Sequence, residues 1–224
     1  MASTEEDERA AGGRAEEEMA VELDAPAGGA DGSLLSVRIR PFVPGDSAAV
    51  AAIWVSGLRQ TVDSISGIKS LLMRRAMEWL ERDATSAGGD VGPDGANLAA
   101  HWFSQDGREM LVATLVGSED DVVVGCCGVI RGTDERKPAP DGSDVCSVWR
   151  VSVAESARRR GVGTALMGAA EDWARARGAC RMRLVTGNPV AATFYVDGMG
   201  YERPGWRWDR MLPRYVMWFE KNFE

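Results

Sequence analysis

The chain has 224 residues, of which 45% are hydrophobic and 27% charged, a composition typical of a soluble protein with one well-packed domain, alone or with a tail. Its longest apolar runs fall far short of the roughly 20 residues that a membrane helix needs, which excludes a bilayer-spanning protein. The net charge of −8 resides entirely in residues 1–33, so residues 34–224 carry equal numbers of acidic and basic side chains. A neutral body gives no electrostatic reason to expect nucleic acid as the main ligand.

Residues 1–33 contain ten acidic side chains and almost no large apolar ones, which predicts a disordered acidic tail. The segment has neither the apolar stretch of a secretory signal nor the acid-poor composition of a transit peptide. We therefore expect a cytoplasmic protein, with the nucleus as the alternative. Residues 34–224 are predicted to form a single domain.

The four cysteines give no sign of a metal site or a disulfide framework. Cys126, Cys127, Cys146 and Cys180 lie in apolar, strand-like surroundings without the paired spacing of zinc ligands. We interpret them as small buried side chains in a reducing compartment. Cys126 and Cys127 are adjacent, so within a strand they would point to opposite faces. No metal is predicted, and nothing around His101, the only histidine, suggests nucleophilic catalysis.

The first half of residues 34–224 is predicted to contain a strand, two helices and a loop. Residues 36–41 alternate polar and apolar side chains, as a half-buried strand does. A turn at 44–46 opens a helix that runs to about residue 63. Apolar residues at helical spacing predict a second helix over 67–83. The next stretch, 84–100, is rich in Gly, Asp and Ala and is predicted to be a mobile loop.

The second half alternates strands and helices. A hairpin is predicted from 110–116 and 122–130, followed by a strand over 145–153 and a helix over 161–178. A strand at 181–185, a short helix at 189–196 and two aromatic-rich strands at 201–208 and 215–219 complete the chain. The predicted order is β-α-α-β-β-β-α-β-α-β-β, which indicates an α/β domain.

The junction between the strand at 145–153 and the next helix has features of a phosphate-binding loop. The segment Arg158-Arg159-Arg160-Gly161-Val162-Gly163 places two glycines and three arginines at a helix start. Glycines let the backbone approach a ligand, and the free N–H groups of the first helical turn attract anions. The segment lacks the lysine of a Walker loop and the third glycine of a dinucleotide fingerprint. An ordinary helix start with a solvated basic rim remains the alternative.

A second segment, Asn188-Pro189-Val190-Ala191-Ala192-Thr193-Phe194-Tyr195, comes one helix and one strand later. Together the two segments resemble the GNAT superfamily of acetyl-CoA-dependent N-acetyltransferases. That family has a Val-x-Val strand leading to Gln/Arg-x-x-Gly-x-Gly/Ala, and a later Asn-x-x-Ala-x-x-Phe-Tyr. The resemblance is specific over about residues 145–202. It implies a mixed, mostly antiparallel central sheet with helices on both faces.

The resemblance also implies a set of site residues. The pantetheine arm of acetyl-CoA would pair like an added strand with the backbone around Val151, Ser152 and Val153. The residues implied at the pyrophosphate are Arg158, Arg159, Arg160, Gly161, Val162, Gly163 and Thr164. Asn188 would reach the cofactor arm, and Tyr195 would stand near the sulfur as the acid that protonates the leaving thiolate.

Two departures from the family pattern are visible. Glu155 stands where many relatives have proline. Four residues rather than three separate Phe194-Tyr195 from Gly200-Tyr201, and this extra residue is expected to displace the end of the helix. Three acids at predicted strand ends, Glu109, Asp144 and Glu155, are more typical of surface acids than of a general base, and we assign none of them.

The implied function is acetyl-CoA:amine N-acetyltransferase, with a small molecule or a protein as the amine acceptor. The alternative is a GNAT-like module that binds acyl-CoA or a partner without catalysis. Nucleic-acid binding through the arginine triplet is disfavoured because no recognised motif accompanies it. Trp206 and Trp208 share one face of a predicted strand, where packing is favoured over an acceptor wall. The partners expected are acetyl-CoA and an amine, without membrane or nucleic acid, and a homodimer stays open.

Overall fold

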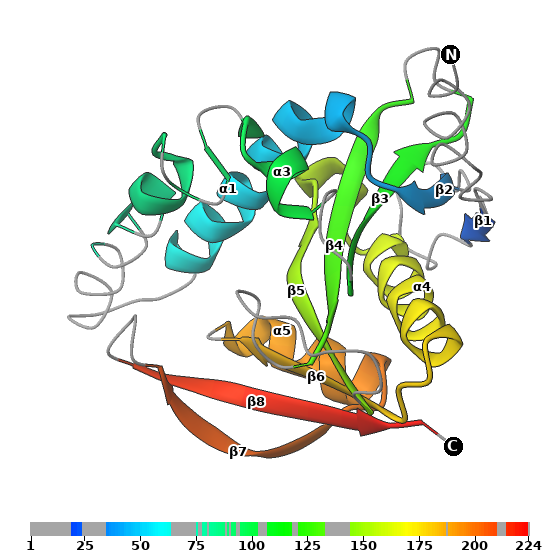
Figure 1. Cartoon of the computed structure of the whole chain (residues 1–224), viewed down its shortest axis with the longest axis vertical. Helices are drawn as coiled ribbons and strands as arrows, with labels where there is room; N and C mark the ends of the chain where they lie inside the picture. Colours follow the sequence, from blue (N-terminus) through cyan, green and yellow to red (C-terminus); the bar gives the residue numbers. More distant parts are fainter. Residues whose placement is uncertain are drawn as a thin grey trace, which may run out of the picture.

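A computed structural model gives the fold of the chain (Figure 1). It describes residues 19–23, 35–63, 75, 78–79, 81–87, 89, 91–92, 95–102, 107–117, 121–132, 144–186, 188–209 and 214–223. Within these ranges the strands form one eight-stranded sheet in the order β1-β2-β3-β4-β5-β6-β8-β7. Every neighbouring pair is antiparallel except β5 and β6, which are parallel. The prediction of a mixed, mostly antiparallel sheet is confirmed.

The strands are β1 Met19–Leu23, β2 Leu35–Pro41, β3 Arg108–Leu115, β4 Val123–Arg131, β5 Val145–Val153, β6 Arg181–Thr186, β7 Glu202–Asp209 and β8 Arg214–Asn222. The helices are α1 Ser47–Asp63, α3 Leu98–Trp102, α4 Val162–Ala176 and α5 Pro189–Thr193, with a π-helix over Phe194–Gly198 directly after α5. Short 3₁₀ turns cover Pro44–Asp46 and Glu155–Ala157.

From residue 35 onward the described strands and long helices keep the predicted order. β1 lies in the segment predicted to be disordered; its alternating Met19, Val21 and Leu23 fit an edge strand paired with β2. The rest of 1–33 lies outside the described residues. Most of the predicted helix 67–83 also lies outside them, although residues 81–85 are helical. The prediction of a loop over 84–100 is wrong at its end, where α3 begins at Leu98.

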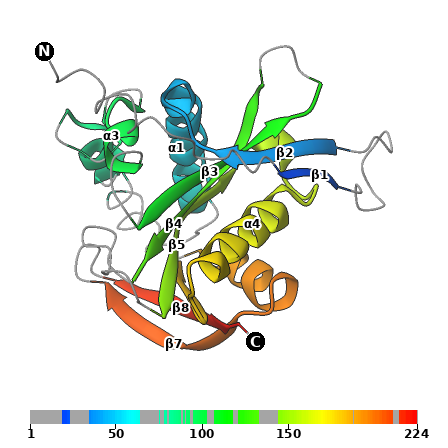
Figure 2. The ribbon, with the colours of Figure 1, turned by 45° about the vertical axis from the view of Figure 1, so that its right-hand side comes forward.

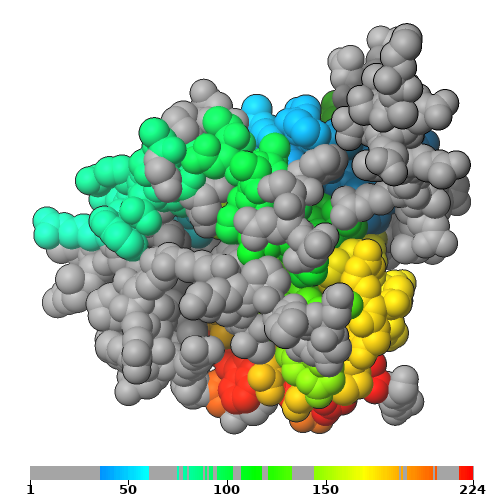
Figure 3. Space-filling model, viewed as in Figure 1, coloured from blue at the N-terminus to red at the C-terminus, as the bar shows by residue number. Residues whose placement is uncertain are grey.

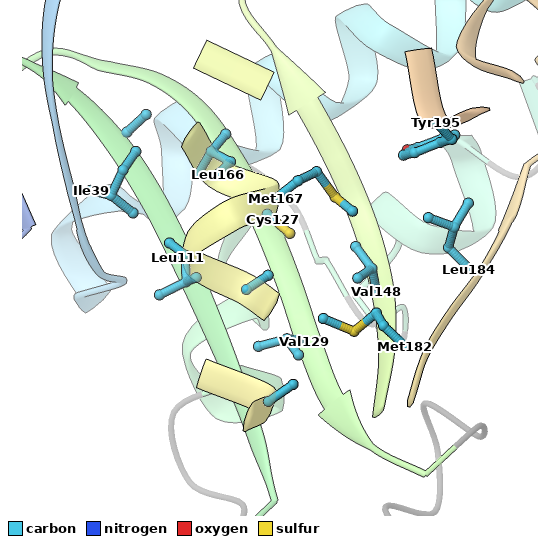
Figure 4. Close-up of a cluster of buried hydrophobic side chains, with 14 of the residues drawn as sticks. Ile39, Leu111, Cys127, Val129, Val148, Leu166, Met167, Met182, Leu184 and Tyr195 are labelled. Carbon is cyan, nitrogen blue, oxygen red and sulfur yellow. The ribbon is translucent and has the colours of Figure 1, made fainter. Parts of the chain in front are cut away.

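Helices cover both faces of the sheet (Figure 2). Strand alternation divides the apolar side chains between the two faces, because successive residues of a strand point in opposite directions. On β3, Leu111 and Ala113 belong to the cluster beneath α4, whereas Met110 and Val112 belong to the cluster beneath α1 and α3. We call these the α4 face and the α1 face. Figure 4 shows Leu166 and Met167 of α4 over β3, β4 and β5, with Tyr195 at one end of the cluster.

The cysteines show the same division. Cys127 belongs to the α4 face and Cys126 to the α1 face, so the prediction that they point apart is confirmed. Cys126, Cys127 and Cys146 are buried, but the prediction of burial is wrong for Cys180. Cys180 is exposed because it lies in the turn between α4 and β6, outside the strand.

An ion pair fixes the start of α1 at the predicted turn. Both terminal nitrogens of Arg40 donate to the carboxylate of Asp46, at 2.7 and 2.9 Å. Asp46 also accepts a hydrogen bond of 2.9 Å from the backbone N–H of Val43. A bidentate pair of this kind is directional as well as strong, so it sets the angle at which α1 leaves β2.

Candidate functional site: the parting of β5 and β6

The two parallel strands separate in the middle of the sheet. β5 pairs with β6 only from Val145 to Ser147. Beyond that point β5 stays with β4 as far as Val153, while β6 stays with β8 as far as Thr186. The second half of β5 is therefore no longer bonded to β6. An extended ligand can pair with such an edge as an added strand would.

A bulge lies in β5 where the strands have parted. Cys126 and Gly128 of β4 pair with Ser152 and Trp149 of β5, so two steps on β4 correspond to three on β5. Arg150 occupies the bulge with a φ of +56°, a left-handed conformation that is uncommon for a residue with a side chain.

The bulge changes which side chains face each way. Val148, Val151 and Val153 pack on the α4 face. Trp149 packs on the α1 face, and the guanidinium of the next residue, Arg150, lies 4.9 Å from the ring centre of Trp54 on α1. Two consecutive side chains thus lie on the same face, which a regular strand does not allow.

The loop after β5 ends in a left-handed glycine. Gly161, with a φ of +81°, precedes the first residue of α4, and no side chain caps the helix there. Since the first N–H groups of a helix lack partners within it, this end of α4 presents donors and the positive end of the helix dipole. Only glycine adopts this φ without strain. These donors and the close approach that glycine allows fit a pyrophosphate, and its binding here stays a prediction.

The three arginines of the loop differ in their surroundings. Arg158 Nε donates a 2.8 Å hydrogen bond to the carbonyl oxygen of Val153, and its Nη1 donates to the side chain of Gln60 on α1. Arg158 therefore ties the loop to the end of β5 and to α1. Arg159 is exposed, with a left-handed φ of +61°, and Arg160 is half-buried.

Three predicted site segments meet at Gly163. A Cβ added to Gly163 would lie 3.4 Å from the Phe194 ring and 3.9 Å from the side chain of Val153. The start of α4, the end of β5 and the segment 188–195 are therefore in contact. The predicted Asn188 is half-buried just before α5, where its backbone N–H donates to the Thr186 hydroxyl at 3.0 Å.

The extra residue after Tyr195 is accommodated by the π-helix. A π-turn holds one more residue than an α-turn, so the chain widens over Phe194–Gly198 and the strand β7 keeps its place in the sheet. The backbone N–H of Tyr201 donates to the carbonyl of Tyr195 at 2.9 Å, and the two rings lie 6.1 Å apart. The expected displacement of the helix end takes the form of this wide turn.

Tyr195 is a buried phenol at the edge of the α4-face cluster. Its ring contacts those of Phe194, Tyr201 and Phe219, with ring centres 5.1, 6.1 and 5.6 Å away. Burial raises the pKa of Tyr195 above its ordinary value, with a smaller contribution from Cys127. A phenol is protonated at neutral pH even at its ordinary pKa, and burial keeps Tyr195 in that form, with a proton available to donate.

The three acids weighed as bases lie in different surroundings. Asp144 precedes β5 at its paired end, where it forms a 3.2 Å ion pair with Arg181, roughly 20 Å of strand from Val151. Glu109 is buried on β3, and Glu155 is exposed beside the loop. The side chains of Trp206 and Trp208 lie outside the described residues. Within the part of the chain that is described, no cluster of three or more His, Cys, Asp or Glu could hold a metal ion.

Sequence reasoning did not identify the bulge at Arg150 or the contact between Arg158 and Gln60. An arginine in a left-handed conformation leaves no signal in a single sequence. The π-helix did leave one, since the extra residue before Gly200 required a wider turn or a shift.

Comparisons with known proteins agree with this geometry. Residues 73–201 match the family model of the acetyltransferase (GNAT) family. The PaiA N-acetyltransferase of Thermoplasma acidophilum, solved in complex with coenzyme A, has a TM-score of 0.60 and 16% identity, covering 84% of this chain and all of that one. The GNAT domain of S. lividans PAT has a TM-score of 0.58 and 18% identity, covering 92% and 97%.

A GCN5-related N-acetyltransferase from Kribbella flavida has a TM-score of 0.55 and 20% identity, covering 84% of this chain and 98% of that one. No curated protein sequence matches the chain. At these identities the solved structures support the fold, while the family model extends over more than half of the sequence. The chain belongs to the GNAT acetyltransferase family.

Proposed function

We propose that the protein is an N-acetyltransferase that moves the acetyl group of acetyl-CoA directly onto a primary amine of a small molecule or a protein. The observation that carries the proposal is the parting of β5 from β6 beside the uncapped, left-handed start of α4. The free edge of β5 suits an extended amide-bearing arm, and the start of α4 suits a pyrophosphate. Coenzyme A contains both groups.

The positions of β5 and α4 suggest which residues would hold each part of acetyl-CoA. The N–H groups at the start of α4, from Val162 to Thr164, would donate to the pyrophosphate. The backbone of Val151 to Val153 would pair with the pantetheine arm along the side of β5 that β6 has left. Bound acetyl-CoA supplies an activated thioester. Asn188, on the segment that reaches Gly163 through Phe194, would contact the arm.

The transfer requires a carbonyl polarised for attack and a proton for the leaving sulfur. Backbone N–H groups near Val151 would stabilise negative charge on the carbonyl oxygen, as an oxyanion hole does. The amine nitrogen forms the new N–C bond as the C–S bond breaks, and the proton that the amine loses passes to solvent. Tyr195, whose phenol is protonated at neutral pH as any tyrosine is, would deliver a proton to the thiolate and regain one from solvent.

The direct test is thiol release from acetyl-CoA, measured with a panel of primary amines, together with mass spectrometry of each acceptor. An acceptor that gains one acetyl group for each thiol released supports the proposal. Acetyl-CoA that binds without any acetylated amine or peptide would instead indicate a binding module without catalysis.

Location and membrane association are independent of this proposal. Across the described ranges, no helix has both the length and the apolar character needed to cross a membrane. The acidic tail and the cytoplasmic or nuclear location remain predictions from the sequence.

A further inference from the structure

The bulge residue of β5 indicates what kind of amine the enzyme accepts, an inference that rests on the proposed function. Arg150 directly precedes Val151, so their Cα atoms are about 3.8 Å apart, the spacing of consecutive residues. If the backbone of Val151 holds the thioester end of the arm, Arg150 is next to the reacting carbonyl.

The two reactants would approach from different faces. The start of α4 and the side chains of Val151 and Val153 belong to the α4 face, so the pyrophosphate would be bound on that side. Trp149 and Arg150 project to the α1 face, where Trp54 lies. The acceptor would therefore meet the thioester from the α1 face, with these side chains beside it.

The side chain of Arg150 is unexpected at this backbone position. A φ of +56° is accessible to glycine at no cost and to asparagine at little cost, but it is unfavourable for arginine. Ser152, the next residue of β5 on the same face, packs against Gly57 of α1, with 3.4 Å from its Oγ to a Cβ added there. The bulge therefore adds the strained Arg150 to the α1 face, between Trp149 and Ser152. Such strain is found at functional sites.

The chemistry of this group favours a carboxylate as its ligand. The guanidinium carbon of Arg150 lies 4.9 Å from the centre of the Trp54 ring. The N–H donors of a guanidinium lie in its own plane, where they match the two oxygens of a carboxylate. Trp54 and Trp149, both half-buried, supply an apolar wall for the body of the acceptor. We propose that the acceptor is a small amine that carries a carboxylate, as an amino acid does, and that Arg150 binds this carboxylate.

The test uses matched pairs of acceptors that differ only in the carboxylate: phenylalanine with 2-phenylethylamine, tryptophan with tryptamine, and lysine with cadaverine. For the wild type we expect kcat/KM to be about 10- to 100-fold higher for the carboxylate member of the preferred pair, the factor expected for a charge-assisted hydrogen bond. Equal values, or a preference for the decarboxylated amines, would overturn the proposal.

Two arginine variants assign the effect to the residue. Arg150→Asn keeps a side chain that tolerates the left-handed conformation but removes the charge, so it should abolish the preference through the acceptor KM. Arg159→Asn makes the same change at a second left-handed arginine, in the predicted cofactor loop, and should raise the KM for acetyl-CoA while keeping the preference. An Arg150→Asn enzyme that loses activity equally on both members of a pair contradicts a role in carboxylate binding.

Binding separates failure of this inference from failure of the proposed function. Thermal melts of the wild type with coenzyme A and each probe report acceptor binding even without transfer. If the carboxylate members raise the Tm of the wild type but not that of Arg150→Asn, this result supports the inference by itself. If amines without a carboxylate are acetylated as well as or better than their carboxylate partners, the transferase proposal stands and this inference fails. If no carboxylate member is acetylated or bound, the inference is overturned.

Discussion

Arg158 joins the loop before α4 to the end of β5, because its Nε donates a 2.8 Å hydrogen bond to the carbonyl oxygen of Val153. The same guanidinium also reaches Gln60 on α1. One side chain therefore connects three elements around the predicted cofactor site, and its charge contributes to positioning the loop. The helix that follows this loop, α4, lies at the surface of the molecule (yellow in Figure 3).

Replacing Arg158 should loosen this connection. Arg158→Ala is expected to lower the free energy of unfolding by about 1.5–3 kcal/mol, the range for a hydrogen bond to a charged group. Gln60→Ala, at an exposed position, should cost about 0.5–1.5 kcal/mol. Urea denaturation of both single variants and the double variant gives the coupling between the two side chains. Strictly additive effects would show that the contact contributes nothing.

Tyr195→Phe separates the phenol hydroxyl from the ring. The ring contacts with Phe194, Tyr201 and Phe219 persist in the variant, so the fold should be retained. Loss of the proton donor should lower kcat by about 10²-fold or more, with little change in the KM for acetyl-CoA. Steady-state kinetics with a fixed acceptor measures both quantities, and an unchanged kcat would exclude Tyr195 as the acid.

Two glycines should respond to alanine in opposite ways. A Cβ added to Gly128 on β4 would lie only 2.3 Å from the Trp102 ring, so Gly128→Ala should cost about 1–3 kcal/mol through overpacking. Gly168, within α4, has open space around its Cβ position. Gly168→Ala should stabilise the protein by about 0.5–1 kcal/mol, because alanine favours the helix. Chemical denaturation of the pair tests the packing of α3 on β4 and the open surroundings of Gly168.

The protein should lose stability at alkaline pH. Burial raises the pKa of Cys126 to about 12 and that of Cys146 to about 11, and it raises the pKa of Tyr195 as well. Above about pH 9 the unfolded chain loses these protons while the folded protein keeps them, so the free energy of unfolding falls with rising pH. Denaturation between pH 8 and 11 measures the slope.

Tyr195→Phe provides the control for this slope. Because an unfolded tyrosine ionises near pH 10, the variant should show a shallower fall only above that pH, with the cysteine contribution below it unchanged. A stability that stays constant from pH 8 to 11 would contradict the burial of these groups.

Much of the fold could be predicted because periodicity reports burial. The β-branched runs gave β3 and β4, and the apolar stripe from Val162 gave α4. Features that depend on contacts between distant segments left no such pattern. The bulge at Arg150 depends on register with β4, and the role of Arg158 depends on Gln60, 98 positions earlier. The glycines were identified by their place at a helix start, a pattern that also fits an ordinary helix start, and the family resemblance favoured the phosphate-binding interpretation. The role of Tyr195 came from the resemblance alone.

The central claim, that the start of α4 binds acetyl-CoA, is tested most directly by thermal melts of the purified protein with acetyl-CoA. A ligand at about 100 times its Kd should add roughly 2.7 kcal/mol, which raises Tm clearly. Thr164→Glu introduces an acid in the first turn of α4, where it is compatible with the helix dipole but repels a pyrophosphate. Ala48→Glu introduces the same side chain in the first turn of α1 as the matched control.

We predict that acetyl-CoA raises the Tm of the wild type and of Ala48→Glu, and that Thr164→Glu melts normally alone but shows no increase with the ligand. An unchanged Tm for the wild type, together with no heat in isothermal titration, would contradict the account and leave the loop from Arg158 to Gly163 as an ordinary helix start.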